Sequence, residues 1–260
     1  LINSHDRSAL EFSYAIDPSA HSSDLPLKDV VWTKLSYVVG QSVPEPASGL
    51  MNADQTLIMQ KMVFDRLWDM PFTEMVKVVG QAPIRQEFYV DLSSRMNIDN
   101  QRWDHESTTF ADAFKYEALG APWVIPEDAI LDTMLGIAEN GPVPVPPMTQ
   151  ALKDQTVLTA RQFTGSALFR KTPIAVKFLP TLLTYAMLHA SVRWDHGMKM
   201  TQNHLFDFDH AAAAMGYCDY FFTDGPLHAR LVRKEVGLDK VYPCKVASTV
   251  DTAMAIVEAV

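Results

Sequence analysis

The sequence predicts an α/β fold with a large helical insertion, and three observations lead to this expectation. Segments at residues 220–223 and 240–246 have the aromatic and β-branched composition of short buried strands. Apolar residues elsewhere recur mostly at helical spacing. A proline-rich run at residues 142–147 marks the boundary between an inserted helical part and the returning core.

The N-terminal part predicts one strand followed by helices. Residues 11–17 alternate apolar and polar side chains and end in an acid followed by proline, which is typical of a strand. Residues 24–40 predict a helix, because an aspartate precedes the apolar stripe and a glycine ends it. After a loop, residues 53–68 predict another helix. A short break then leads into a helical turn that holds Glu74.

The rest of the chain predicts an insertion and a return to the core. Residues from about 84 to 150 predict a mostly helical insertion that ends at the proline run. Further helices follow to residue 200. An Ala-rich helix then starts at Asp207, the next strand ends at Asp224, and a last strand and helix complete the chain. This order predicts a Rossmann-like core with a parallel sheet, in one domain that spans residues 1–260.

Composition restricts the functional classes. The chain has 260 residues, of which 48% are hydrophobic, so it can form a substantial core. Its net charge of −9 argues against a general nucleic-acid-coating surface but not against a nuclease, because an acidic metal site carries negative charge itself. Cys218 and Cys244 have no metal-ligand spacing and form no disulfide framework, which favours a reducing, cytoplasmic location. The sequence contains no run of about 18 apolar residues, so we expect no membrane span.

Residues 203–224 place acids at the two ends of a predicted helix-turn-strand unit. The residues concerned are Asp207, His210, Ala211, Thr223 and Asp224. In this spacing the segment resembles the C-terminal half of PIN-like nuclease domains. It is most similar to a prokaryotic subgroup that reads Asn-Asp-x-x-Asp-x-x-His-Ala and then Tyr-Cys-Asp-x-Phe-x-Thr-Asp, although Asn203 and His204 stand where that subgroup has Asn-Asp. The resemblance implies a single PIN-like domain with a three-layer core, a parallel sheet and a helical insertion.

The resemblance also implies a metal site. The matching acids, in chain order, are Asp17, Glu74, Asp207 and Asp224. Carboxylates from separate segments suit Mg²⁺ or Mn²⁺, which prefer hard oxygen ligands. The strand end at Asp224 and the helix start at Asp207 favour these two positions independently of the resemblance, because ligands bind at the carboxyl ends of parallel strands.

Several acids compete for these roles or surround them. Asp29 is an alternative to Asp17, and Glu117 is an alternative to Glu74 as the early-helix acid. Asp209 is a candidate for a supporting role. His204 stands where an acid is expected, so it binds a softer metal, orients a water or marks weakened activity. The ordinary alternative for each acid is a helix cap, a turn residue or a surface charge.

A nuclease also needs cations that meet phosphate. Arg193 and Lys199 precede the acidic segment, and Trp194 offers a surface for base stacking. A solvated helix face is an equally good interpretation of these cations. The expected partner is RNA, single-stranded rather than duplex. The resemblance implies a homodimer or a partner in a defence or toxin system as further possibilities.

Together, these expectations predict that the chain is a metal-dependent endoribonuclease, which hydrolyses phosphodiester bonds with a metal-activated water. The alternative is a catalytically inactive PIN-like module that acts in RNA binding or protein assembly. A phosphatase of the haloacid dehalogenase type is a weaker alternative, because it needs Asp-x-Asp after the first strand and this chain has Asp17, Pro18 and Ser19 there.

Overall fold

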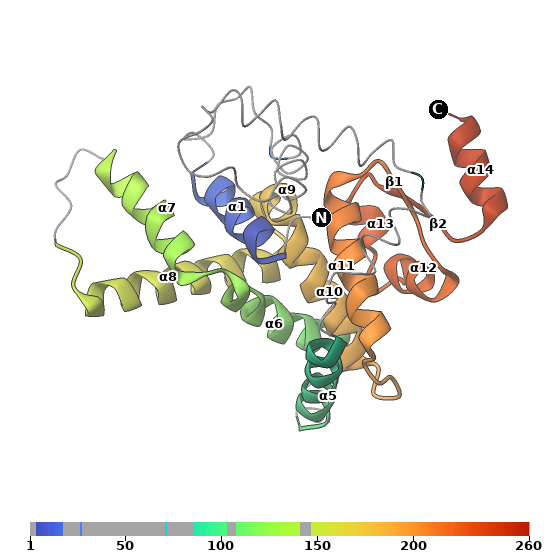
Figure 1. Cartoon of the computed structure of the whole chain (residues 1–260), viewed down its shortest axis with the longest axis horizontal. Helices are drawn as coiled ribbons and strands as arrows, with labels where there is room; N and C mark the ends of the chain where they lie inside the picture. The colour runs from blue at the N-terminus through green and yellow to red at the C-terminus, as the bar shows by residue number, and fades with distance from the viewer. Residues whose placement is uncertain are drawn as a thin grey trace. The chain divides into compact units, whose positions relative to one another are not determined.

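The computed structural model describes residues 4–17, 27, 71, 86–102, 108–140 and 147–259. The chain divides into two compact units, residues 1–3 with 22–88 and residues 4–21 with 89–260. Nearly all of the described residues belong to the second unit, which is mainly helical (Figure 1).

The helices and strands of the described part follow in chain order. They are α1 (Ser4–Ile16), α5 (Gln86–Arg102), α6 (Phe110–Gly120), the 3-10 helix η2 (Ala121–Val124), α7 (Glu127–Glu139), α8 (Gln150–Phe169), α9 (Pro173–Phe178), α10 (Pro180–Trp194), α11 (Gln202–Tyr217), β1 (Tyr220–Phe222), α12 (Gly225–Val232), α13 (Leu238–Val241), β2 (Lys245–Ala247) and α14 (Val250–Glu258).

The prediction of a three-layer, Rossmann-like α/β core of the PIN type is wrong. Among the described residues, the sheet consists of two three-residue strands, β1 and β2, which pair in parallel with Phe221 opposite Val246. A sheet of this size cannot separate two helical layers, so helix-on-helix packing forms the core instead.

The predicted first strand is part of a helix, α1. Its buried side chains are Arg7, Ser8, Glu11, Phe12, Tyr14 and Ala15, which recur at the spacing of one helical face. Seven residues of apparent alternation do not distinguish a strand from a helix, because the same residues also fit the helical period once residues before position 11 are included.

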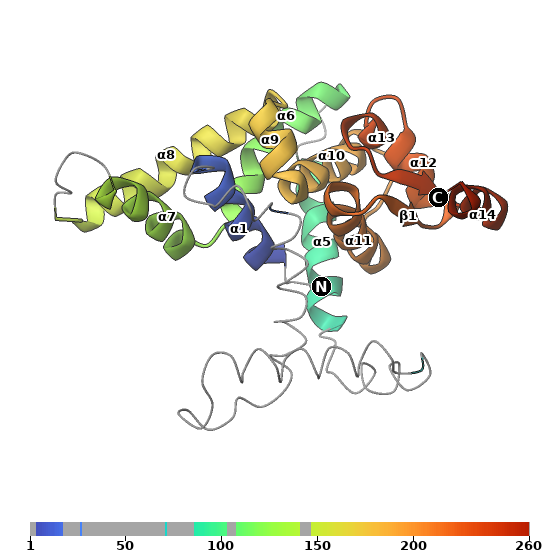
Figure 2. The same cartoon turned by 90° about the horizontal axis from the view of Figure 1, so that it is seen from above.

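Helix α10 is the centre of the core. It is buried along almost its whole length and lies between α6 and α11 (Figure 2). Its N-terminus contacts the C-terminal end of α11, where Gly216 faces Pro180 so closely that an added Cβ would lie 2.8 Å from the proline Cγ. Glycine at residue 216 therefore lets the two helices approach.

A polar network joins α1 to both of these helices. Glu11 is fully buried, and its carboxylate accepts hydrogen bonds from the backbone N–H of Thr181, at 3.1 Å, and from the Tyr217 hydroxyl. The Arg7 Nε donates to the Thr181 hydroxyl at 2.9 Å. Burial raises the pKa of Glu11 to about 7, against the opposing effect of these donors.

The C-terminal part retains the strand-helix-strand order that the sequence predicts. Strand β1 ends at Phe222, helices α12 and α13 follow, and β2 returns beside β1. Backbone hydrogen bonds extend the pairing at both ends, from Lys245 N–H to the Asp219 carbonyl and from Thr223 N–H to the Ala247 carbonyl, each at 2.9 Å. This arrangement fixes the start of α12, which forms one wall of the candidate site.

Candidate functional site

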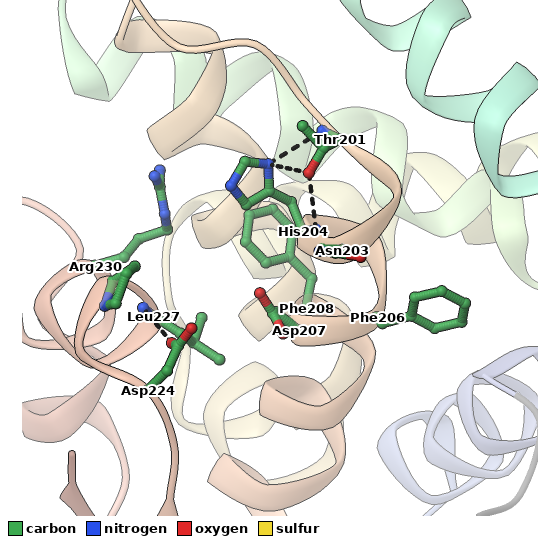
Figure 3. Close-up of a pocket in the computed structure, with 10 residues that line it drawn as sticks. Thr201, Asn203, His204, Phe206, Asp207, Phe208, Asp224, Leu227 and Arg230 are labelled. Atoms are coloured by element: carbon green, nitrogen blue, oxygen red, sulfur yellow. Dashed lines mark hydrogen bonds between the residues drawn. The ribbon is translucent and has the colours of Figure 1, made fainter. Parts of the chain in front are cut away.

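A pocket of about 450 Å³ lies between α11 and α12 (Figure 3). Both helices contribute polar side chains to it. The lining residues are Thr201, Asn203, His204, Phe206, Asp207, Phe208, Asp224, Pro226, Leu227 and Arg230. The structure thus brings Asp207 and Asp224, which are 17 positions apart in the sequence, to one cavity.

Helix α11 begins with a capping box. The Thr201 hydroxyl accepts from the backbone N–H of His204 at 3.4 Å, and the His204 Nδ1 accepts from the backbone N–H of Thr201 at 3.1 Å. Asp207 follows His204 by three positions, so both side chains project from the same helical face. The helix therefore starts at Gln202, and Asp207 lies in its second turn rather than at its start.

Asp224 is placed by the end of β1. It is the N-cap of α12, and its Oδ1 accepts from the Leu227 backbone N–H at 2.9 Å. In Figure 3 its carboxylate and that of Asp207 lie on the same side of the pocket, below the His204 ring. One residue therefore caps a helix and presents a carboxyl group to the pocket.

The charges in the pocket influence one another. Burial raises the pKa of Asp207, and the neighbouring Asp224 raises it further. The pKa of His204 is lowered, first by burial and then by the Arg230 guanidinium, while the two aspartates oppose this change. The pocket therefore disfavours two simultaneous negative charges at its acids and a positive charge at its histidine.

Arg230 is a pocket residue that the sequence interpretation missed. Its guanidinium donates to the Ser191 hydroxyl at 2.9 Å and to the Met198 sulfur. A sequence feature could have identified Arg230. Leu227 and Arg230 follow Asp224 at intervals of three residues in a short helix, so the three residues share one face.

The structure places Arg193 and Glu117 in the core rather than at this pocket. The Arg193 side chain is 4% exposed, and its Nε pairs with the Glu117 carboxylate at 2.7 Å. Its Nη2 pairs with Asp99 at 2.9 Å, and the guanidinium lies over the Tyr116 ring. Arg193 is therefore not available to phosphate, and Glu117 is committed to an ion pair. Lys199 is exposed but does not line the pocket.

Two of the remaining candidates do not line the pocket, and two fall outside the described residues. Asp17 follows the last residue of α1, and its backbone N–H donates to the Ser13 carbonyl at 3.0 Å, so it ends a helix rather than a strand. Asp209 accepts a hydrogen bond from the Tyr185 hydroxyl and does not line the pocket. Glu74 and Asp29 fall outside the residues that the structure describes.

A divalent metal needs several oxygen or nitrogen ligands that converge on one point. Among the described residues, no three His, Cys, Asp or Glu side chains converge closely enough to hold an ion. Two carboxylates do line the pocket, and Asn203 also lines it. Mg²⁺ commonly binds through one or two carboxylates and completes its shell with water and substrate phosphate, so this oxygen-rich set fits Mg²⁺ or Mn²⁺.

Comparison with known proteins gives no relative: no family model matches this sequence, and no curated protein or solved structure matches it. In the described part of the chain, no helix combines the length and the apolar character that crossing a membrane requires.

Proposed function

We propose that this chain is a metal-dependent phosphodiester hydrolase that acts on RNA, with Asp207 and Asp224 as the residues that hold Mg²⁺ or Mn²⁺. One observation carries the proposal: two carboxylates from separate elements line one pocket, and Asp224 raises the pKa of Asp207. A bound divalent cation would offset this mutual repulsion, which is the usual reason for bringing like charges together.

The residues of the pocket divide into two groups by charge. Asp207 and Asp224 supply oxygen ligands, and the Asn203 amide adds a neutral polar group. The metal, when bound, would polarise the phosphate and lower the pKa of a coordinated water. The carboxylates orient the cation and do not attack the substrate. Arg230 contributes positive charge to a pocket that must receive a polyanion.

The test is cleavage of a labelled single-stranded RNA by the purified chain with Mn²⁺ or Mg²⁺, with a chelator as the reference. Asp224→Asn is expected to lose cleavage and keep its fold, because asparagine is as good an N-cap as aspartate and preserves the bond to Leu227. Asp251→Asn is the matched control, since Asp251 is exposed on α14 and does not line the pocket. Cleavage that survives both the chelator and Asp224→Asn would refute the proposal.

A catalytically inactive RNA-binding module is the second candidate. Two observations favour it: His204 occupies a position where the resembled subgroup has an acid, and the described residues supply two converging carboxylates rather than three. This candidate predicts that the chain binds single-stranded RNA and leaves it intact with both metals at pH 7 to 9. Cleavage that depends on Asp224 would exclude it.

A further inference from the structure

The protonation of the His204 ring follows from its capping bond. A backbone N–H can only donate, so the His204 Nδ1, 3.1 Å from the Thr201 nitrogen, must be the acceptor. The Thr201 hydroxyl lies 3.0 Å from the same Nδ1 and can donate to it as well. The neutral ring therefore carries its proton on Nε2. In Figure 3 this atom points away from Thr201, across the pocket and toward the side of Arg230.

Among the described residues, no carboxylate forms an ion pair with Arg230. The two groups that accept hydrogen bonds from its guanidinium, the Ser191 hydroxyl and the Met198 sulfur, are both neutral. Asp195 is the carboxylate with the largest influence on it, but Asp195 pairs with Arg233 at 3.6 Å instead. Burial of the guanidinium lowers its pKa, so its charged form is under-stabilised within the part of the chain described.

Two donors thus border the same part of the pocket, and nothing described there accepts from the His204 Nε2–H. Two facing donors leave a position for a ligand with negatively charged oxygen atoms. The carboxylates of Asp207 and Asp224 lie in the lower part of the view in Figure 3, away from this position. The pocket therefore has a donor half and an acceptor half.

We propose that His204 and Arg230 form an anion subsite that binds a non-bridging phosphate oxygen of the substrate, opposite the Asp207–Asp224 pair. The identity of that phosphate as a backbone phosphodiester rests on the proposed function; the anion subsite itself rests on the two donors. In this arrangement His204 is neither a metal ligand nor a general base, because its Nδ1 is occupied by the cap and its Nε2 carries the proton.

The first test is binding of two probes to the full chain without metal: inorganic phosphate, and a 2′-O-methyl RNA tetranucleotide that resists cleavage and contains only internal phosphodiesters. Arg230→Met is expected to weaken both by about tenfold or more, because hydrogen bonds to charged groups are the strong ones. Lys234→Met is the matched control. It also removes one positive charge just beyond α12, from an exposed residue that does not line the pocket, and it is expected to change binding less than twofold.

The second test concerns His204 and does not depend on Arg230 variants folding. His204→Gln keeps the capping box, since glutamine also accepts from the N-cap N–H, but loses the ring donor. It is expected to weaken phosphate binding several-fold with α11 intact, whereas His204→Asp, which adds a negative charge, weakens it more. Long-range ¹H–¹⁵N NMR of the imidazole, assigned by the signal lost in His204→Gln, is expected to report the Nε2–H form and to shift when phosphate is added.

The outcomes separate this subsite from the proposed hydrolase. If Arg230→Met abolishes phosphate binding and the wild-type chain cleaves no RNA, the subsite is supported and the hydrolase is refuted. If the wild-type chain cleaves RNA with metal, and neither Arg230→Met nor His204→Gln changes phosphate binding, the subsite is overturned and the hydrolase stands. An Nδ1–H tautomer overturns the subsite directly. Binding of inorganic phosphate without the tetranucleotide overturns the assignment to an internal phosphodiester.

Discussion

The Glu11 carboxylate on α1 caps the N-terminus of α10 by accepting from the backbone N–H of Thr181. The two donor-acceptor distances are 3.1 and 3.2 Å. Leu179, the residue at the N-cap of α10, has no side-chain group for this bond, and Pro180 has no N–H. A side chain 170 residues away therefore satisfies the first free donor of the most buried helix.

This long-range cap predicts an unusual dependence of stability on pH. The pKa of Glu11 is raised from 4.5 to about 7 in the folded chain, so the folded state holds this proton more tightly than the unfolded state. The contribution is complete below about pH 4.5 and is lost as the pH rises through 7, by about 3 kcal/mol in total at about 1.4 kcal/mol per unit. Urea unfolding at several pH values measures it.

Glu11→Gln provides the comparison, because glutamine mimics the protonated acid. The variant is expected to gain stability relative to the wild type as the pH rises from 5 to 8. Parallel stability profiles for the two chains would show that Glu11 titrates normally.

The contact between Gly216 and Pro180 predicts a large effect of a small substitution. A Cβ at residue 216 would overlap the proline ring, so Gly216→Ala is expected to lower the free energy of unfolding by about 1–3 kcal/mol. Gly136→Ala is the control: it lies in α7 with nothing within 4 Å of an added Cβ, and is expected to stabilise by about 0.5–1 kcal/mol. Equal effects of the two substitutions would contradict the close approach of α10 and α11.

Arg193 is buried and pairs with two less buried carboxylates, which indicates a structural role. Arg193→Met leaves Glu117 and Asp99 without their cation, and we expect a loss of about 3 kcal/mol in thermal or denaturant unfolding. Lys199→Met, at an exposed residue, is expected to stay within about 0.5 kcal/mol of the wild type. If Arg193→Met unfolds like the wild type but binds RNA more weakly, then Arg193 is a surface residue in solution.

We expect a substitution at Asp207 to have opposite effects on stability and on activity. Burial and Asp224 both disfavour its charge, so Asp207→Asn is expected to raise the melting temperature without metal while it abolishes cleavage. Added Mn²⁺ is expected to raise the melting temperature of the wild type and not of this variant. Calorimetry with and without Mn²⁺ decides the point, and a variant that melts lower than the wild type in chelator would argue against repulsion between the two acids.

The sequence predicted the parts of the site that depend on neighbouring residues. Asp224 stands at the end of a strand, as its aromatic segment before Gly-Pro indicated, and Asp207 lies on the expected helix, one turn further in. Both features follow from local composition and turn chemistry.

Features set by long-range contacts could not be read in this way. Arg193 had the same appearance as a surface cation, but its partners Glu117 and Asp99 lie 76 and 94 positions away. The strand predicted at residues 11–17 failed for a related reason, since the burial of α1 depends on its packing against α7, α9 and α10. Without that strand, β1 and β2 remain a pair among the described residues, and the α/β architecture reduces to the C-terminal part of the unit.

Two pocket residues, His204 and Asp224, also cap the N-termini of α11 and α12, and this restricts how the pocket can change in evolution. A substitution at either position that cannot accept a backbone hydrogen bond weakens the start of α11 or α12 by about 0.5–2 kcal/mol. Relatives of this chain should therefore exchange Asp, Asn, Gln, Glu, Ser or His there, and almost never an aliphatic side chain. Substrate preference can drift at Asn203, which lines the pocket without capping either helix, while the two capping positions vary only within that narrow set.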